Sequence, residues 1–156
     1  MTKEELMREA VCLAVANVQA GRGGPFASLI VRNGAIIASG TNLVTSANDP
    51  TAHAEVVAIR EACRMLGDFR LSGCELYTTC EPCPMCLGAI YWARLDRVVY
   101  AATRDDAVRA GFDDGFIYRE LCMPASERTL PMEQIEREAA QEPFRVWEMQ
   151  EGRVRY

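Results

Sequence analysis

The stretch PCPMC at residues 82–86 and the stretch HAE at residues 53–55 decide the fold and the chemistry of this chain. Each begins a segment with helical spacing of apolar residues, and each follows a predicted strand and loop. Cys83 and Cys86 are three residues apart, so their sulfurs share one face of a helix. We therefore predict that the two helix starts meet at one edge of a sheet.

The residue types at this edge are those of a catalytic zinc site. His53, Cys83 and Cys86 are the predicted ligands of one zinc ion per chain, because such a site has three protein ligands and one open position for water. Zinc lowers the pKa of a bound water towards ~7, and helix N-termini favour the two thiolates.

Glu55 is the predicted proton carrier. Residues two apart on a helix point to different sides, so His53 must occupy the helix cap. H-x-E with P-C-x-x-C is the known signature of zinc deaminases.

Other interpretations stay open at this point. A C-x-x-C pair can be a thioredoxin-like redox pair. Cys80 added to the three predicted ligands would make a closed Cys₃His site, which leaves no position for water and belongs to a non-catalytic structural zinc module. The other cysteines are predicted to be small buried apolar residues: Cys12, Cys63, Cys74 and Cys122.

Composition narrows the class of protein. The 156 residues suit a single domain, and no apolar run is long enough to span a membrane. The net charge of −5 disfavours a nucleic-acid partner. Glu4, Glu5 and Glu9 place negative charge where a signal peptide carries positive charge, and seven cysteines without a secretory signal favour metal or catalytic roles. We therefore expect a cytoplasmic protein.

The chain alternates helical and β-type patterns. This order predicts an α/β fold in which a mixed sheet lies between helices. The predicted helices are 2–19, 50–65, 82–93 and 143–150; the predicted strands are 26–32 and 35–38 around an Asn33-Gly34 type I′ turn, 74–79 and 97–101; and residues 40–48 and 111–115 are predicted loops.

Several stretches of the chain resemble the small bacterial guanine deaminases of the cytidine deaminase superfamily. They are GGPF at 23–26, NDPTAHAE at 48–55, CEPCPMCLGAIYWAR at 80–94, AGFDDGFIY at 110–118 and the terminal Tyr156. The central run is shared with much of the superfamily, including tRNA adenosine deaminases. The stretch GFDD at 111–114 and the terminal tyrosine are what point to guanine.

The resemblance implies a cytidine-deaminase-like three-layer α/β/α sandwich with a five-stranded mixed sheet, which hydrolyses guanine to xanthine and ammonia. It also implies roles for single residues at the matching positions. Asp114 would contact the base and assist proton movement, although Asp113 is a second candidate for the contact. The other implied substrate-binding residues are Phe26, Asn42, Ala54, Trp92 and Tyr156.

The resemblance further implies a homodimer in which the segment from about residue 121 to residue 156 is exchanged between subunits, so that Tyr156 closes the partner's pocket. The chain departs from the family pattern at residue 115, where it has a glycine and the family pattern has a serine. The nearest rival function is deamination of another amino-heterocycle, such as adenosine in tRNA, cytidine or a triazine. A tRNA substrate would favour a basic surface, which the net charge does not supply.

Overall fold

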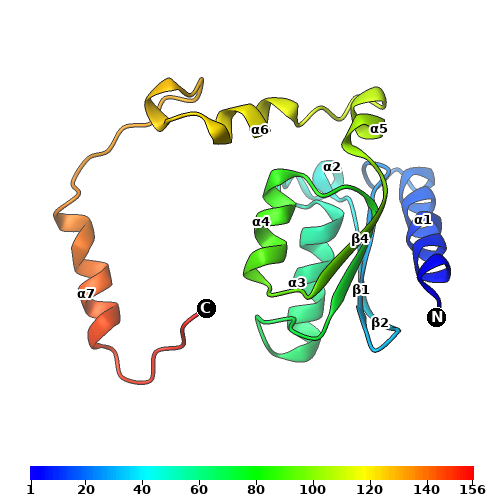
Figure 1. The fold of residues 1–156 in the computed structure, drawn as a ribbon, viewed down its shortest axis with the longest axis horizontal. Coiled ribbons are helices and arrows are strands. Elements are labelled where there is room, and N and C mark those ends of the chain that lie inside the picture. Colours follow the sequence, from blue (N-terminus) through cyan, green and yellow to red (C-terminus); the bar gives the residue numbers. More distant parts are fainter. The chain divides into compact units, whose positions relative to one another are not determined.

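The computed structural model describes all 156 residues, which divide into two compact units, Met1–Asp114 and Gly115–Tyr156. The first unit is a sheet with helices on both faces (Figure 1), so the predicted α/β/α arrangement is confirmed. The second unit consists of short helices and connecting segments. No helix in the chain combines the length and apolar character needed to cross a membrane.

The sheet has four strands in the order β2-β1-β3-β4. It is mixed, because β1 pairs antiparallel with β2 and β3 whereas β3 and β4 are parallel. Asn33 and Gly34 both have positive φ between β1 and β2, as a type I′ turn requires. The strands are β1 (Ala27–Arg32), β2 (Ala35–Thr41), β3 (Glu75–Cys80) and β4 (Arg97–Ala102).

The expected fifth strand is absent, which corrects the sequence-based prediction in this detail. Thr103 begins a helix directly after β4, and its side chain and that of Asp106 form a reciprocal capping box there. All regular elements after β4 are helical: α5 (Arg104–Arg109), α6 (Gly115–Cys122), the short 3₁₀ turns Ala125–Glu127 and Ala139–Gln141, and α7 (Glu142–Met149).

Helices cover the two faces of the sheet in the first unit. The helix α1 (Lys3–Gln19) lies on one face, while α3 (Ala54–Leu66) and α4 (Pro84–Trp92) lie on the other (Figure 1). The β1 side chains alternate accordingly, because Leu29 packs in the cluster with α1 and Ile30 packs in the cluster with α3 and α4. The predicted capping box of Thr2 and Glu5 at the start of α1 is present.

Other boundaries differ from the prediction. Strand β2 continues to Thr41 and a short helix α2 (Val44–Ala47) follows, where a loop was expected. The helix expected from residue 50 begins at Ala54, because residues 50–53 form a turn that leads into it. The prediction that all four remaining cysteines are buried was wrong: Cys12 and Cys122 are exposed and Cys63 is half-buried, whereas Cys74 is buried.

Candidate active site

Two helix N-termini carry the predicted metal ligands. His53 is the N-cap of α3 and has extended backbone, so it stands outside regular helical geometry as the spacing required. Cys83 is the N-cap of α4, and Pro84 follows it in the first turn, where a missing N–H costs nothing. The backbone N–H of Cys86 points to the Cys83 sulfur, with 3.5 Å between nitrogen and Sγ.

The ligand atoms of His53, Cys83 and Cys86 lie close together. Nδ1 of His53 lies 3.5 Å from the Sγ atoms of both Cys83 and Cys86, and the ligand atoms all lie within 4.8 Å of one another. A tetrahedral zinc ion with bonds of about 2.1 Å to nitrogen and about 2.3 Å to sulfur separates such atoms by roughly 3.6 Å. The donor set therefore fits zinc in both chemistry and spacing.

Glu55 places a carboxylate beside this donor set. Its side chain is only 6% exposed. One carboxylate oxygen accepts a hydrogen bond from the Thr78 hydroxyl at 3.4 Å, and the other accepts one from the Cys86 thiol at 3.4 Å. Burial raises the pKa of Glu55. A raised pKa makes the carboxylate a stronger base than that of a free glutamate, as a group that accepts and passes on a proton requires.

The charges at the site favour a bound thiolate. Hydrogen bonds from Cys86 and His53 lower the pKa of the Cys83 thiol to about 4, although burial opposes this effect. The hydrogen bond to Cys83 raises the pKa of His53 in turn. Burial, reinforced by the negative charge on Cys83, raises the pKa of Asp114, so this predicted site residue also lies within electrostatic reach of the donor set.

Cys80 does not join the donor set. Its thiol donates towards the backbone carbonyl of Thr103, at 3.6 Å from Sγ to oxygen, and burial raises its pKa to about 11. Its sulfur is not among the ligand atoms that lie within 4.8 Å of one another. The arrangement therefore leaves three protein ligands, as in a catalytic zinc site, and disfavours the closed Cys₃His alternative.

Three predicted substrate-binding residues lie along the same edge of the sheet. Asn42 directly follows β2, and its backbone N–H donates to the carbonyl of Phe26 at 3.1 Å. The Phe26 ring meets the Phe112 ring edge to face, with centroids 4.9 Å apart. Ala54, the first residue of α3, is fully buried beside the caps. Phe112 was missed as a ring partner, although it lies in the GFDD stretch.

The structure does not bring Trp92 to the donor set. Trp92 ends α4, about two turns beyond the cysteines at the start of that helix, and it is largely exposed. Tyr156 belongs to the second unit. Their predicted contacts with substrate therefore remain predictions.

Comparison with known proteins places the chain in a family. Residues 1–102 match the family described as cytidine and deoxycytidylate deaminase zinc-binding region. This chain belongs to the cytidine and deoxycytidylate deaminase family. The matched range contains both helix starts and therefore the whole donor set with Glu55.

Comparisons with two relatives and two solved structures are informative. Guanine deaminase of Bacillus subtilis is 58% identical over 147 residues, which is 94% of each chain. The X-ray structure of guanine deaminase from Bacillus subtilis superposes with a TM-score of 0.97 and 55% identity over 100% of this chain and 99% of the other. The tRNA-specific adenosine deaminase of Aquifex aeolicus is 43% identical over 65% of this chain and 67% of its own. The crystal structure of a protein variant in complex with 8-azaguanine matches with a TM-score of 0.70 and 40% identity, over 73% of this chain and 66% of that one.

The deaminase site contains a buried hydroxyl pair that sequence reasoning missed. Ser28 of β1 donates to the Thr78 hydroxyl of β3 at 2.9 Å, and Thr78 in turn donates to Glu55. Both hydroxyls are almost fully buried. Their only signal in the sequence is one serine in β1 and two adjacent threonines in β3, which is too common to single out.

Gly40 sets the distance between β2 and α3 in this deaminase fold. A Cβ atom at Gly40 would overlap the carbonyl oxygen of Ala54 and the backbone of Ala58. The first turn of α3, which carries His53 and Glu55, can approach the sheet only because residue 40 has no side chain. The geometry of the site therefore depends on a glycine that is not itself part of the predicted donor set.

Gly40→Ala is expected to lower both stability and zinc content. Overpacking of this kind costs about 1–3 kcal/mol, and the displaced turn would move His53 away from the two cysteines. Thermal melting and metal analysis of the purified protein measure the two effects. Gly88→Ala on α4 is the matched control, because a Cβ there meets nothing within 4 Å. A Gly40→Ala protein with unchanged melting and full zinc would contradict the close approach.

Proposed function

We propose that this chain catalyses the zinc-dependent hydrolysis of guanine to xanthine and ammonia, as a hydrolase of a cyclic amidine C–N bond in purine catabolism or salvage. The proposal is carried by a donor set with three protein ligands beside a buried carboxylate, in a chain 58% identical to a guanine deaminase over 94% of its length. The similarity to the tRNA-specific relative covers only 65% of the chain. The similarity to guanine deaminase covers 94% of the chain and therefore extends into the second unit.

His53, Cys83 and Cys86 would hold one zinc ion per chain. Zinc supplies the Lewis acid that makes a water molecule nucleophilic at neutral pH. The N-termini of α3 and α4 favour negative charge at this point through their exposed N–H groups. Cys80 donates towards the Thr103 carbonyl and lies outside the donor set, which leaves the fourth position open.

Glu55 would move the protons. Its carboxylate accepts a proton from the attacking water as the water oxygen bonds to C2 of guanine, and it delivers this proton to a ring nitrogen. The bond between C2 and the exocyclic amino nitrogen then breaks. The new C2 hydroxyl becomes the carbonyl of xanthine, and its proton passes through Glu55, with help from Asp114, to the ammonia that leaves. Burial supports this role, because a carboxyl of raised pKa is both a competent base and a competent acid.

The purine would be held by residues around the donor set. Asn42 would donate its side-chain N–H to the base, since its Oδ1 already accepts from the backbone N–H groups of Gly24 and Val44. Phe26 would form a wall of the pocket, Ala54 would line its floor through the backbone, and Asp114 would contact the base. Trp92 and Tyr156 complete the predicted set.

The proposed reaction is tested by the ultraviolet change on mixing purified protein with guanine. We expect stoichiometric conversion to xanthine that stops when a chelator removes zinc and returns when zinc is restored. Adenosine in tRNA, cytidine and a triazine are the parallel substrates. Zinc-loaded protein that leaves guanine unchanged but deaminates one of these would keep the reaction type and exclude the substrate.

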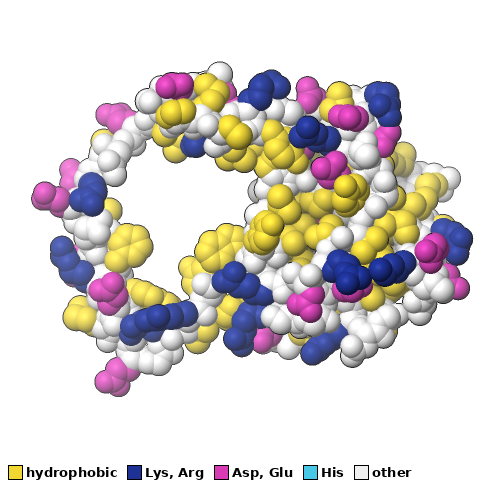
Figure 2. Space-filling model, viewed as in Figure 1, with side chains coloured by type: hydrophobic (Ala, Val, Ile, Leu, Met, Phe, Trp, Pro, Cys, Tyr) yellow, Lys and Arg dark blue, Asp and Glu magenta, His cyan; other side chains and the backbone are white.

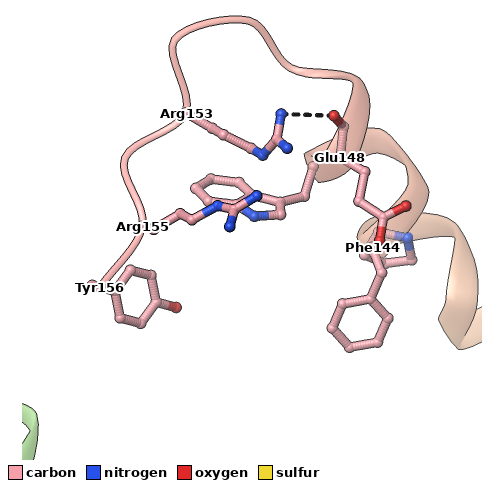
Figure 3. Close-up of a pocket in the computed structure, with 7 residues that line it drawn as sticks. Phe144, Glu148, Arg153, Arg155 and Tyr156 are labelled. Carbon is pink, nitrogen blue, oxygen red and sulfur yellow. Dashed lines mark hydrogen bonds between the residues drawn. The ribbon is translucent and has the colours of Figure 1, made fainter.

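We also propose that the protein is a homodimer that exchanges the segment from about residue 121. No residue of Gly115–Tyr156 is buried, and hydrophobic side chains lie at its surface (Figure 2). Phe144, Trp147 and Tyr156 help to line a pocket of about 570 Å³ within this unit, where the Phe144 and Tyr156 rings project to one side (Figure 3). A segment with so much exposed apolar surface favours a partner.

Complementation tests the exchange. Glu55→Gln removes the proton carrier, and Tyr156→Ala is expected to weaken guanine binding through the loss of a pocket-closing ring. If Tyr156 acts across the dimer, co-expression of the two variants builds one site with Glu55 and the partner's Tyr156, so turnover with the normal KM should return. Activity no greater than the sum of the two separate variants would show that each chain completes its own site.

We place the enzyme in the cytoplasm. All seven cysteines are free thiols, and the donor set requires two of them as thiolates. A reducing compartment keeps such thiols available for metal.

A further inference from the structure

Asn17 is the one polar residue among the buried residues of α1. The others are Leu6, Ala10 and Ala14, which pack against the sheet. Asn17 is 0% exposed. An amide in such a position is unfavourable unless it makes hydrogen bonds, so its partners explain why it is tolerated there.

Both partners of Asn17 are backbone carbonyls on the substrate side of the fold. Its Nδ2 donates to the oxygen of Gly24 at 3.0 Å and to the oxygen of Asn42 at 2.9 Å. These two segments come from different parts of the chain, and each carries a residue proposed to bind the purine: Phe26 follows Gly24, and Asn42 is itself the second. One amide group therefore joins the two halves of the proposed base-binding edge.

The loop held by Asn17 is tightly organised. The backbone N–H of Gly24 donates to Oδ1 of Asn42 at 3.2 Å, and the Val44 N–H reaches the same oxygen at 3.3 Å. A Cβ atom at Gly23 would overlap the Asn42 carbonyl. The orientation of the Asn42 side chain thus depends on the position of the Gly24 segment, and Asn17 fixes that segment through its hydrogen bond to the Gly24 carbonyl.

The side-chain oxygen of Asn17 supports the same conclusion. Its Oδ1 is buried and has no hydrogen-bond partner in the protein. A residue kept only for packing would favour an apolar side chain of this size, such as leucine, which leaves no acceptor unpaired. The two donated hydrogen bonds are therefore the feature that distinguishes asparagine here.

We propose that Asn17 is a positioning residue for purine recognition, which fixes the Gly24 and Asn42 carbonyls so that Phe26 and Asn42 are set in place before the base arrives. This inference rests on the proposed function for the identity of the base. It assigns Asn17 no contact with substrate or metal. Preorganisation of this kind acts on binding, because less ordering is left to be done when the ligand arrives.

The test compares two variants in the same helix. Asn17→Leu keeps the number of side-chain heavy atoms and removes both donors, and Asn17→Asp keeps the shape but cannot donate to both carbonyls. We expect KM for guanine to rise about tenfold while kcat changes by less than about threefold and zinc content is unchanged. Leu6→Ala is the control, because Leu6 is buried in α1 but packs in the cluster with Leu29 and Tyr77 and does not touch this loop. It should lower stability and leave KM unchanged.

Hydrogen exchange gives a readout that needs no substrate. The amides of Gly24 and Val44 should exchange on the order of tenfold faster in the Asn17 variants than in the wild type, and Leu6→Ala should not show this selective loss. Unchanged KM and unchanged exchange in the Asn17 variants would overturn the inference, as would an equal rise in KM for Leu6→Ala. If the wild type itself leaves guanine unconverted, the proposed function fails, and the exchange comparison still decides whether Asn17 holds the loop.

Discussion

Glu55→Gln is expected to lower kcat for guanine by about 10³-fold, within the range that general acid–base catalysis contributes. The amide has the shape of the carboxylate and can keep the hydrogen bond from Thr78, but it cannot accept the water proton. Because Glu55 is outside the donor set, zinc should stay at one ion per chain. Steady-state kinetics and metal analysis of the same preparation measure both quantities.

Glu61→Gln is the matched control for this variant. Glu61 lies on the same helix, faces solvent and pairs with Arg64, so its loss should change neither kcat nor zinc content. If Glu55→Gln retained kcat within about tenfold of the wild type, the proton would have to travel by another group, and Asp114 would be the first to examine.

Cys83→Ala is expected to remove zinc and activity together. The variant leaves His53 and Cys86 as the remaining donors, and two ligands hold zinc far less tightly than three. Stability should fall as well, because metal affinity contributes to the folding free energy. Metal analysis, guanine turnover and thermal melting with and without added zinc measure the three effects.

Cys80→Ala separates the loss of a ligand from the loss of a buried cysteine. Cys80 lies near Cys83 in sequence and is more deeply buried, but its thiol faces Thr103. We expect Cys80→Ala to keep full zinc and most of the activity. A Cys83→Ala protein that kept one zinc per chain, or a Cys80→Ala protein that lost it, would show that the donor set is wrongly assigned. A disulfide between Cys83 and Cys86 without stoichiometric metal would favour the redox alternative instead.

The local features of this fold were readable from the sequence because their causes are local. Asn33-Gly34 predicts its turn since both residues tolerate positive φ, and Thr2 with Glu5 predicts the start of α1. The cap position of His53 followed from its distance of two residues from Glu55. Where local signals were weak, the start of α3 was predicted too early and α5 and α6 were not predicted. The number of strands was wrong because it came from the resemblance and not from a local pattern.

The sequence by itself singled out the residues that we propose to bind metal and carry protons, because ligand type and spacing along a helix are local properties. Only the tertiary structure decided what holds them in place. The Ser28–Thr78–Glu55 chain, the approach of α3 to Gly40 and the two carbonyls held by Asn17 all join segments distant in sequence. Such contacts have no period along the chain, since they depend on how β1, β3 and the helices pack.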